Sequence, residues 1–252
     1  MKKIGIVGGV AWPSTVVYYS EICRRSEGWH FARNMQGAPS TPEMTIESLD
    51  LNKAVSYLGT DDDEESWSHF DDYHRAALKR LEASGADFAL LASNTAHHRF
   101  ASIVRGVGTP VISIFEVVAK ESARIGARSV LILGTNLTMR STVLREEFAK
   151  LGVEAAGPPD AAARATAVDL IAELQLGKLE GAADRLGRIA KVSFKRLFSS
   201  EPAVCLACTE LPLAFPAHKL LATFEYDGVL YVNSTAAHID AAFNLAINGW
   251  ST

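Results

Sequence analysis

The chain has 252 residues, of which 48% are hydrophobic, and its formal net charge is -4 with a pI near 6.0. This length can bury a large core, either as one compact unit or as two modest domains. The weakly acidic charge leaves no basic patch of the kind that binds nucleic acid or an anionic membrane surface. No apolar run reaches the roughly 18 residues of a membrane-spanning helix. We therefore expect a globular protein with neither nucleic acid nor membrane as a partner.

The start of the chain, MKKIGIVGGV, joins two lysines to a short apolar segment. Glycines and a tryptophan follow without the small-residue cleavage pattern of a secretory signal, so we expect no signal peptide and a cytoplasmic protein. The three cysteines, Cys23, Cys205 and Cys208, are an odd number, which argues against a disulfide framework. Cys23 falls in an amphipathic helical pattern and Cys205 inside an apolar run, so both are predicted to be core thiols.

Short β-type runs alternate with helical patterns in the first part of the chain. KIGIVGG predicts a strand, and STVVYYSEICRRS predicts a helix that Ser14 or Thr15 could cap. MTIESL predicts a second strand, and the acidic run from Asp61 to Ser66 predicts a solvated helix start. The helical pattern HFDDYHRAALKRLEASG stops at Gly85. FALLAS is wholly apolar, which predicts a central strand of a parallel sheet.

A similar series begins again after Pro110. Strands are predicted at PVISIF, SVLILG (129–134), AVCLA and VLYVN, and helices at VVAKESARIG, TNLTMRSTVLREEFAKLG, 161–176, 180–198 and STAAHIDAAFNLAIN. This alternation predicts an α/β fold of two similar domains, each a parallel sheet flanked by helices. Because the second series starts near residue 108, we expect one domain of residues 1–108 plus 217–252 and another of residues 109–216.

Two of the predicted strands end alike. FALLASNT and AVCLACTE each run from an apolar strand into a nucleophile-type residue and then a polar one, at Ser93 and at Cys208. In open α/β sheets, ligands bind beyond the carboxyl ends of the strands. If a pseudo-twofold axis relates the domains, Ser93 and Cys208 would flank one substrate in a cleft between them. Two such groups suit proton transfer at a carbon atom, one removing a proton and one supplying it.

Five segments carry a family resemblance: GIVGGVAWPSTVVYY, LLASNTAHH, LILGTNLTM, LACTELPL and NSTAAH. Together they resemble the aspartate/glutamate racemase family of cofactor-independent amino-acid racemases. The resemblance implies two α/β domains, a site between them, a homodimer, and no pyridoxal phosphate or metal. It also implies two cysteines at the strand ends, one thiolate taking the Cα proton and one thiol returning a proton to the other face.

The sequence departs from this pattern at two positions. Cys208 matches the second family cysteine, but Ser93 stands where most members have the first. Some members have threonine there, and the WPST form of the first motif is similar to that subgroup. Asn233 stands where the family usually has aspartate, which we expect to weaken a hydrogen bond behind the site.

The remaining candidates are substrate-binding residues. Asn94 and Thr95 could direct side chains and backbone N–H groups at a carboxylate from a helix N-terminus. Thr95 and Thr209 could stabilise charge that develops at Cα, whereas Thr135 and Thr138 are either helix caps or ligand contacts. We also expect Cys208 to be a thiolate, favoured by a helix N-terminus. The full predicted substrate-binding set is Val10, Glu43, Asn94, Thr95, Thr135, Thr138 and Thr209.

Other chemistries have weaker signals. His97 and His98 have no partners at metal-ligand spacing, although His97 could bias the Ser93 side electrostatically. GIVGGV lacks the third glycine of the dinucleotide fingerprint, so no nicotinamide cofactor is expected. The leading hypothesis is a cofactor-independent racemase of a small amino acid that uses Cys208 and Ser93. The alternatives are a lyase resembling arylmalonate decarboxylase, in which a single cysteine protonates an enediolate, and a degenerate amino-acid binding protein.

Overall fold

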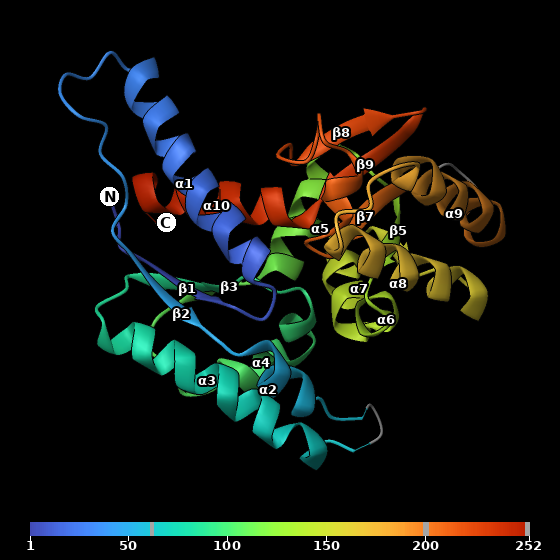
Figure 1. Ribbon diagram of the computed structural model, residues 1–252, viewed down its shortest axis with the longest axis horizontal. Coiled ribbons are helices and arrows are strands. Elements are labelled where there is room, and N and C mark those ends of the chain that lie inside the picture. The colour runs from blue at the N-terminus through green and yellow to red at the C-terminus, as the bar shows by residue number, and fades with distance from the viewer. Residues whose placement is uncertain (61–62, 199–201, 250–252) are drawn as a thin grey trace. The chain divides into compact units, whose positions relative to one another are not determined.

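The computed structural model describes residues 1–60, 63–198 and 202–249. It divides into two compact units (Figure 1). The first unit comprises Met1–Ser113 and Ile239–Thr252, and the second comprises Ile114–His238. Within the described part of the chain, no helix is long and apolar enough to cross a membrane.

The first unit contains a four-stranded parallel sheet in the order β2-β1-β3-β4. Its strands are β1 (Ile4–Gly8), β2 (Met44–Ser48), β3 (Phe88–Leu91) and β4 (Val111–Ile112). The central pair, β1 and β3, is buried along its whole length. This burial on both faces explains why both strands are continuous apolar runs.

Helices cover both faces of this sheet. Tyr18 of α1 (Trp12–Ala32) and Ile239 of α10 (Ser234–Asn248) pack with Ile4 and Ile6 on one face. Leu81 of α3 (Ser68–Ala83) lies against the backbone of β1 on the other face (Figure 1). The short helices of this unit are α2 (Leu51–Ser56), η1 (Glu65–Trp67), η2 (Thr95–Arg99) and α4 (Phe100–Ile103).

The second unit contains a five-stranded sheet in the order β6-β5-β7-β9-β8, parallel except for β8. Its strands are β5 (Ser129–Gly134), β6 (Glu154–Ala156), β7 (Ala203–Ala207), β8 (Thr223–Tyr226) and β9 (Val229–Asn233). Its helices are α5 (Ile114–Arg124), α6 (Asn136–Arg140), α7 (Thr142–Ala149), α8 (Ala161–Gln175), α9 (Ala182–Leu197) and η3 (Leu211–Ala214).

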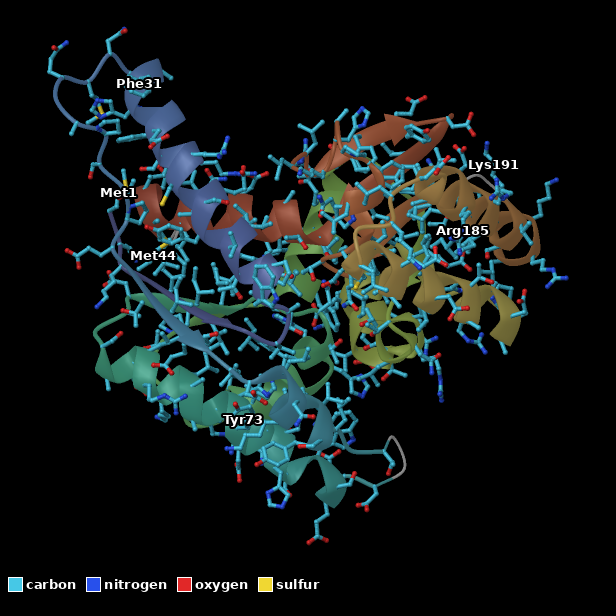
Figure 2. The ribbon with its side chains drawn as sticks, viewed as in Figure 1. Met1, Phe31, Met44, Tyr73, Arg185 and Lys191 are labelled. Atoms are coloured by element: carbon cyan, nitrogen blue, oxygen red, sulfur yellow. The ribbon has the colours of Figure 1, made fainter. Side chains whose placement is uncertain are left out.

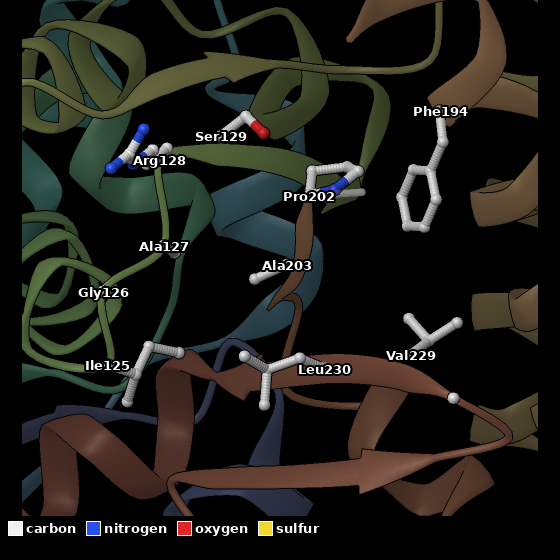
Figure 3. A pocket seen from close by; sticks show the side chains of 11 residues that line it. Ile125, Gly126, Ala127, Arg128, Ser129, Phe194, Pro202, Ala203, Val229 and Leu230 are labelled. Carbon is white, nitrogen blue, oxygen red and sulfur yellow. The ribbon is translucent and has the colours of Figure 1, made fainter. Parts of the chain in front are cut away.

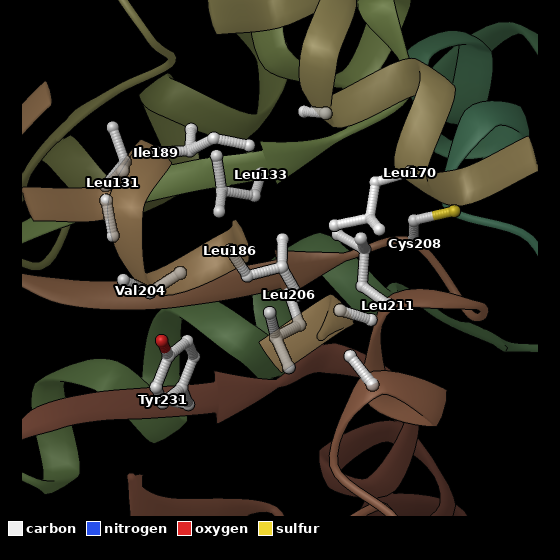
Figure 4. Packing of buried hydrophobic residues seen from close by; sticks show 14 of the residues in the cluster. Leu131, Leu133, Leu170, Leu186, Ile189, Val204, Leu206, Cys208, Leu211 and Tyr231 are labelled. Carbon is white, nitrogen blue, oxygen red and sulfur yellow. The ribbon is translucent and has the colours of Figure 1, made fainter. Parts of the chain in front are cut away.

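Alternate residues of β5 and β7 face two separate cores in this unit. Leu131 and Leu206 pack with α8 and α9 on one face (Figure 4). Ile132 and Cys205 pack with α5 and α7 on the other. Cys208 lies at the margin of the first core, immediately after β7. The period-two alternation of a strand therefore places Cys205 inside the core, as the sequence predicts, and leaves Cys208 at the strand end.

The two sheets share one topology. In each unit the second strand in the chain lies on one side of the first strand, and the third lies on its other side. β1 thus corresponds to β5, and β3 corresponds to β7. Ser93 follows β3 and Cys208 follows β7, so the two residues occupy equivalent positions in their own units.

The segment 217–252 differs from its predicted place in the first domain. β8 and β9 form a hairpin in the second sheet, and β9 also pairs with β7. The turn residues Asp227 and Gly228 have φ angles of 48° and 71°, which is the backbone of the tight two-residue turn that joins antiparallel strands. Because this hairpin completes the second sheet, the chain returns to the first unit only at Ile239. The other transition lies between Ser113 and Ile114.

Three local predictions are wrong. PVISIF forms a strand only at Val111–Ile112, and Ile114 already begins α5, because a short apolar run does not distinguish a strand from a buried helix. The predicted single helix after SVLILG is broken at Ser141, which caps α7. At the start of α1 the N-cap is Ala11, and neither Ser14 nor Thr15 caps the helix. Asp61–Asp62, in the predicted acidic helix start, lie outside the described residues.

Candidate functional site

The carboxyl ends of β1 and β3 form the candidate site of the first unit. Since the strand order reverses between β1 and β3, their ends define the topological switch point at which open α/β sheets bind ligands. Val10, half-buried, lies in the turn after β1. Gly9 in this turn has φ +87°, and a Cβ there would collide with the Leu49 carbonyl oxygen. Glycine therefore lets the turn pass close to the end of β2.

Ser93, Asn94 and Thr95 lie at the end of β3. Ser93 and Thr95 are half-buried, and Asn94 is buried. Asn94 precedes η2, a helix of only five residues. A helix this short contributes little dipole, so an anion here would depend on individual N–H and side-chain donors. The structure thus brings together four predicted residues of the first unit: Val10, Ser93, Asn94 and Thr95.

His97 stabilises the backbone of this loop through the Ser93 carbonyl. Its Nδ1 lies 2.8 Å from the Ser93 carbonyl oxygen, and its ring stacks on Phe100 at 5.2 Å. Burial lowers the pKa of His97 to about 4, although the carbonyls of Ser93 and Ile112 oppose this shift. His97 is therefore neutral at pH 7, which argues against the predicted electrostatic bias on Ser93 by a charged ring.

Arg99 holds the far end of the same loop. Its guanidinium donates to Asp71 of α3 at 2.7 Å and to Glu64 at 2.6 Å, and it lies 5.5 Å from the centre of the Trp67 ring. Hydrogen bonds to the two carboxylates raise the pKa of Arg99. Glu64 thus has a specific partner and is not only a solvated acid of the predicted run. These contacts give the loop after Ser93 a defined shape.

Glu43 lies at the wrong end of the sheet for substrate contact at Ser93. It is exposed and precedes Met44, the first residue of β2, which is labelled in Figure 2. Met44 pairs with Ile4 at the amino end of β1. Because the strands are parallel, their carboxyl ends lie at the opposite edge, so the structure does not bring Glu43 to the other predicted residues.

The carboxyl ends of β5 and β7 form the equivalent edge in the second unit. Thr135 follows β5 and caps α6, and its hydroxyl lies 2.9 Å from that of Thr138. Gly134, the last residue of β5, pairs with Ala207, the last residue of β7. This register places the two threonines beside the strand end that carries Cys208. Thr135 fulfils the predicted cap role, and the paired hydroxyls remain candidates for ligand contact.

Cys208 forms a hydrogen-bonded cluster with Glu210. The Cys208 thiol donates to Glu210 Oε2 at 2.9 Å, and the Thr209 hydroxyl donates to the same oxygen at 2.9 Å. Burial raises the pKa of Cys208 well above its usual value, and the Glu210 charge and hydrogen bond raise it further. Backbone N–H groups of Glu210 and Leu211 act in the opposite direction but are outweighed. In this arrangement Cys208 is a thiol, contrary to the expected thiolate.

Glu210 is a functional candidate that the sequence reasoning missed. It is 7% exposed, although a buried carboxylate is unfavourable unless it is hydrogen-bonded. Two side-chain donors, from Cys208 and Thr209, supply that compensation. The available signal was its position two residues after Cys208 in a segment that follows a buried strand.

Asn233 caps the N-terminus of α10, and its amide oxygen makes the hydrogen bonds that a carboxylate could make there. Its Oδ1 accepts from the backbone N–H groups of Thr235 at 3.1 Å and Ala236 at 3.2 Å, at the start of α10. Its Nδ2 donates to the Lys219 carbonyl at 2.9 Å, a bond that an aspartate could not make. The amide therefore adds a donor at this position, and the expected weakening relative to aspartate stays a prediction.

The other cysteines have different surroundings. Cys205 is fully buried, and burial raises its pKa to about 12, as expected for a core thiol. Cys23 is only partly buried, so the core prediction fails for it. Among the described residues, no group of three His, Cys, Asp or Glu side chains is arranged to hold a metal ion.

The profile of the Asp/Glu/hydantoin racemases matches residues 7–242, a range that includes both Ser93 and Cys208. This chain belongs to the Asp/Glu/hydantoin racemase family. The resemblance inferred from the five segments is confirmed. The assignment to a subgroup of this racemase family with a hydroxyl at the first cysteine position stays a prediction.

Solved structures of racemases share this architecture. An aspartate racemase homologue from Pyrococcus horikoshii OT3 is 29% identical with a TM-score of 0.74, over 98% of this chain and 99% of that chain. A putative Asp/Glu racemase from Yersinia pestis is 24% identical with a TM-score of 0.79, over 98% and 100%. A variant of arylmalonate decarboxylase is 14% identical with a TM-score of 0.56, over 100% and 95%. The predicted α/β fold, with helix-flanked and mainly parallel sheets, is confirmed.

Proposed function

We propose that this protein racemises or epimerises a small amino acid by proton transfer at Cα, without a cofactor, using Cys208 and Ser93. The observation that carries the proposal is the equivalent placement of these residues after β3 and β7, at the switch point of each sheet. Membership of the racemase family and the similarity to an aspartate racemase homologue support it. We also propose that the protein is cytoplasmic and forms a homodimer.

Cys208 and Glu210 act together in the proposed reaction. Since Cys208 rests as a thiol, it first passes its proton to the Glu210 carboxylate along the existing hydrogen bond. The thiolate then takes the Cα proton, so the Cα–H bond breaks, an S–H bond forms and the electron pair remains on the substrate. Glu210 returns its proton to solvent at the end of the cycle. A positioned base of this kind contributes typically 10²- to 10⁴-fold to a rate.

Ser93 supplies the proton to the opposite face of the carbanion, directly or through a water. The Ser93 O–H bond breaks as the new Cα–H bond forms, and the resulting alkoxide takes a proton from solvent. The serine hydroxyl is far less acidic than a thiol, whose reference pKa is about 8.5, but the carbanion is a still stronger base. Ser93 can therefore donate a proton in this direction, although it is a poor base in the reverse one.

The carbanion needs donors that stabilise its enolate-like charge. Asn94 and Thr95 are the candidates in the first unit, whereas Thr135, Thr138 and Thr209 are those in the second. The Thr209 hydroxyl already donates to Glu210. It becomes free to donate to substrate when Glu210 accepts the thiol proton.

Deuterium incorporation at Cα tests the proposal. The full chain is incubated in deuterated water with a panel of D- and L-amino acids, a 5-substituted hydantoin and an arylmalonate. Deuterium at Cα with inversion supports the racemase. Carbon dioxide release would instead support the lyase, which a resting thiol also suits because it could protonate an enediolate. Binding without exchange would indicate the amino-acid binding protein.

Replacement of Cys208 is the corresponding variant test. Cys208→Ala is expected to abolish Cα exchange because it removes the sulfur that receives the proton. Cys23→Ala is the matched control, since Cys23 lies on α1 away from the strand ends, and it should remain active. Circular dichroism should show an unchanged fold for both. Retention of a tenth or more of the exchange rate by Cys208→Ala would refute the catalytic assignment.

A further inference from the structure

One side of α1 carries apolar side chains that are exposed to solvent. Trp12 is 69% exposed, Val16 is 55% exposed and Tyr19 is 49% exposed. Cys23 is partly buried and follows four residues later. Intervals of four, three and four residues place these four side chains on one side of the helix, here called the outer face of α1. Tyr18 packs against the sheet on the opposite side, so the outer face points away from the core of the first unit.

Most of the outer face lies in an uncharged segment of the sequence. Between Ile4 and Ser20 the chain contains no Asp, Glu, Lys or Arg, and the first charged residue of α1, Glu21, is buried. A helix at the surface of a globular protein normally turns charged residues toward water. Loss of charge together with exposed Trp and Tyr is typical of the centre of a protein–protein interface. Such a face can also meet a copy of itself without repulsion between like charges.

The shape of the outer face favours a protein partner over a small ligand. Figure 3 shows apolar surface of the other kind, a pocket whose lining includes Phe194, Val229 and Leu230. Phe194 and Val229 are only 8% and 5% exposed there, whereas Trp12 and Tyr19 project from a helix. Small-molecule sites are concave. Projecting side chains of a helix instead pack into the grooves of a second helix.

The exposed area of the outer face suits the centre of a dimer interface. A whole aromatic side chain buries about 150–250 Å². The exposed fractions of Trp12 and Tyr19 therefore correspond to roughly 250 Å² together. Each partner contributes about 800 Å² to a standard interface, of which the rim is polar. The two rings thus supply about a third of one partner's share, and the half-buried Thr15 and Ser20 on either side of them are available for the rim.

We propose that the outer face of α1 binds the same face of a second copy of this chain, with the two helices antiparallel about a twofold axis. This inference rests on the homodimer proposed above and specifies its surface. An axis between positions 17 and 18, the middle of the outer face, brings together residues whose numbers add up to 35. Trp12 then lies against Cys23 of the partner subunit, and Tyr19 lies against Val16 of the partner subunit. Each large ring meets a smaller side chain, which allows the close packing of an interface centre.

Analytical ultracentrifugation of the full chain tests this surface. The wild type should sediment as a dimer, and Tyr19→Arg should raise the dissociation constant at least about 30-fold, because it removes an aromatic anchor and places two like charges in the contact. Phe31→Arg is the matched control, since Phe31 is 64% exposed near the end of the same helix but lies outside the outer face (Figure 2). It should leave the dissociation constant unchanged. Equal dissociation constants in both variants would overturn the surface alone, whereas a monomeric wild type would overturn the homodimer as well.

Cross-linking tests the antiparallel register. On oxidation with copper phenanthroline, Trp12→Cys should form a disulfide with Cys23 of the partner subunit, which a non-reducing gel detects as a covalent dimer. The wild type should form none, because the two copies of Cys23 lie at opposite ends of the contact. Phe31→Cys, an exposed thiol outside the outer face, is the control and should also form none. No cross-link in Trp12→Cys, or one that persists when Cys23→Ala is added, would overturn the register. Neither experiment measures Cα exchange, so both outcomes are independent of the proposed racemase activity.

Discussion

At Cys208, the carboxylate that holds the thiol proton is also placed to accept it. Glu210 raises the pKa of Cys208 through its charge and its hydrogen bond, in addition to the larger effect of burial. The same 2.9 Å contact offers a direct route for proton transfer. Glu210 therefore makes the resting thiol less acidic, and in the proposed reaction it is also the base that activates this thiol.

Glu210→Gln separates these two effects. Removing the charge should lower the pKa of Cys208, so alkylation by iodoacetamide should begin at a lower pH. Removing the proton acceptor should decrease the Cα exchange rate about 100-fold. Glu225→Gln, at an exposed site on β8, is the control for loss of one negative charge in the same unit. An alkylation profile that shifts while exchange stays at the wild-type rate would contradict the role of Glu210 as proton acceptor.

Residue types at strand ends could be predicted from the sequence, but their acid–base state could not. Ser93 and Cys208 stand out because each follows a buried strand. The thiol state of Cys208 depends on burial and on the rotamer of Glu210, neither of which is a property of the segment alone. Glu43 shows a related failure. It directly precedes the predicted strand MTIESL, and in a parallel sheet the residue before a strand lies at the amino edge, as the pairing of Met44 with Ile4 at the start of β1 shows.

At the scale of single elements, the loop after β3 contains a buried neutral histidine, His97, and an arginine, Arg99, that forms an ion pair with α3. His97 holds the Ser93 carbonyl, and Arg99 joins the loop to α3 through Asp71. Burial lowers the pKa of His97 to about 4 and also lowers the pKa of His74. Both rings therefore oppose protonation in the folded chain.

The low pKa of His97 in this loop predicts that the folded chain becomes less stable in mild acid. The pKa of His97 is about 4 when folded, below its usual 6.5, so the unfolded chain binds more protons between these values. Stability is thus retained above pH 6.5 and falls as the pH decreases toward 4, by up to about 3 kcal/mol for His97. Urea unfolding at several pH values should show this fall, and His97→Gln should reduce it. His69→Gln, at an exposed site on α3, should not. Equal slopes in all three chains would contradict the assignment to His97.

Most of the long helices and strands could be predicted from local sequence patterns, whereas the pairing of strands within the sheets could not. SVLILG and AVCLA match β5 and β7 residue for residue. β8 was not predicted from the sequence. Its pairing with β9, and that of β9 with β7, place β9 in the second unit, and such pairing depends on contacts between residues that are distant in sequence. PVISIF was misassigned since Ile114 and Phe115 are buried in a helix as fully as they would be in a strand.

For the whole molecule, the repeated topology makes the two units comparable position by position. Ser93 corresponds to Cys208 after the third strand of each unit, and counting onward places Thr95 where the second unit has Glu210. The difference therefore extends beyond serine and cysteine, because threonine at the Ser93 end stands in place of Glu210, the carboxylate that we propose as acceptor of the Cys208 proton. The proposed reaction should be chemically unequal in its two directions.

We expect this inequality in the kinetics of the two enantiomers. The isomer that presents its Cα proton to Cys208 should have the higher kcat, because the other would need the Ser93 hydroxyl as base. Racemisation has an equilibrium constant near one, so kcat/KM must stay equal for both enantiomers and the difference must appear in kcat and KM separately. Ser93→Cys should raise kcat for the slow enantiomer, since a thiol is a much better base. Ser68→Cys, at an exposed site on α3, should have no effect. Equal kcat values in the wild type, with no gain in Ser93→Cys, would show that Ser93 does not transfer a proton.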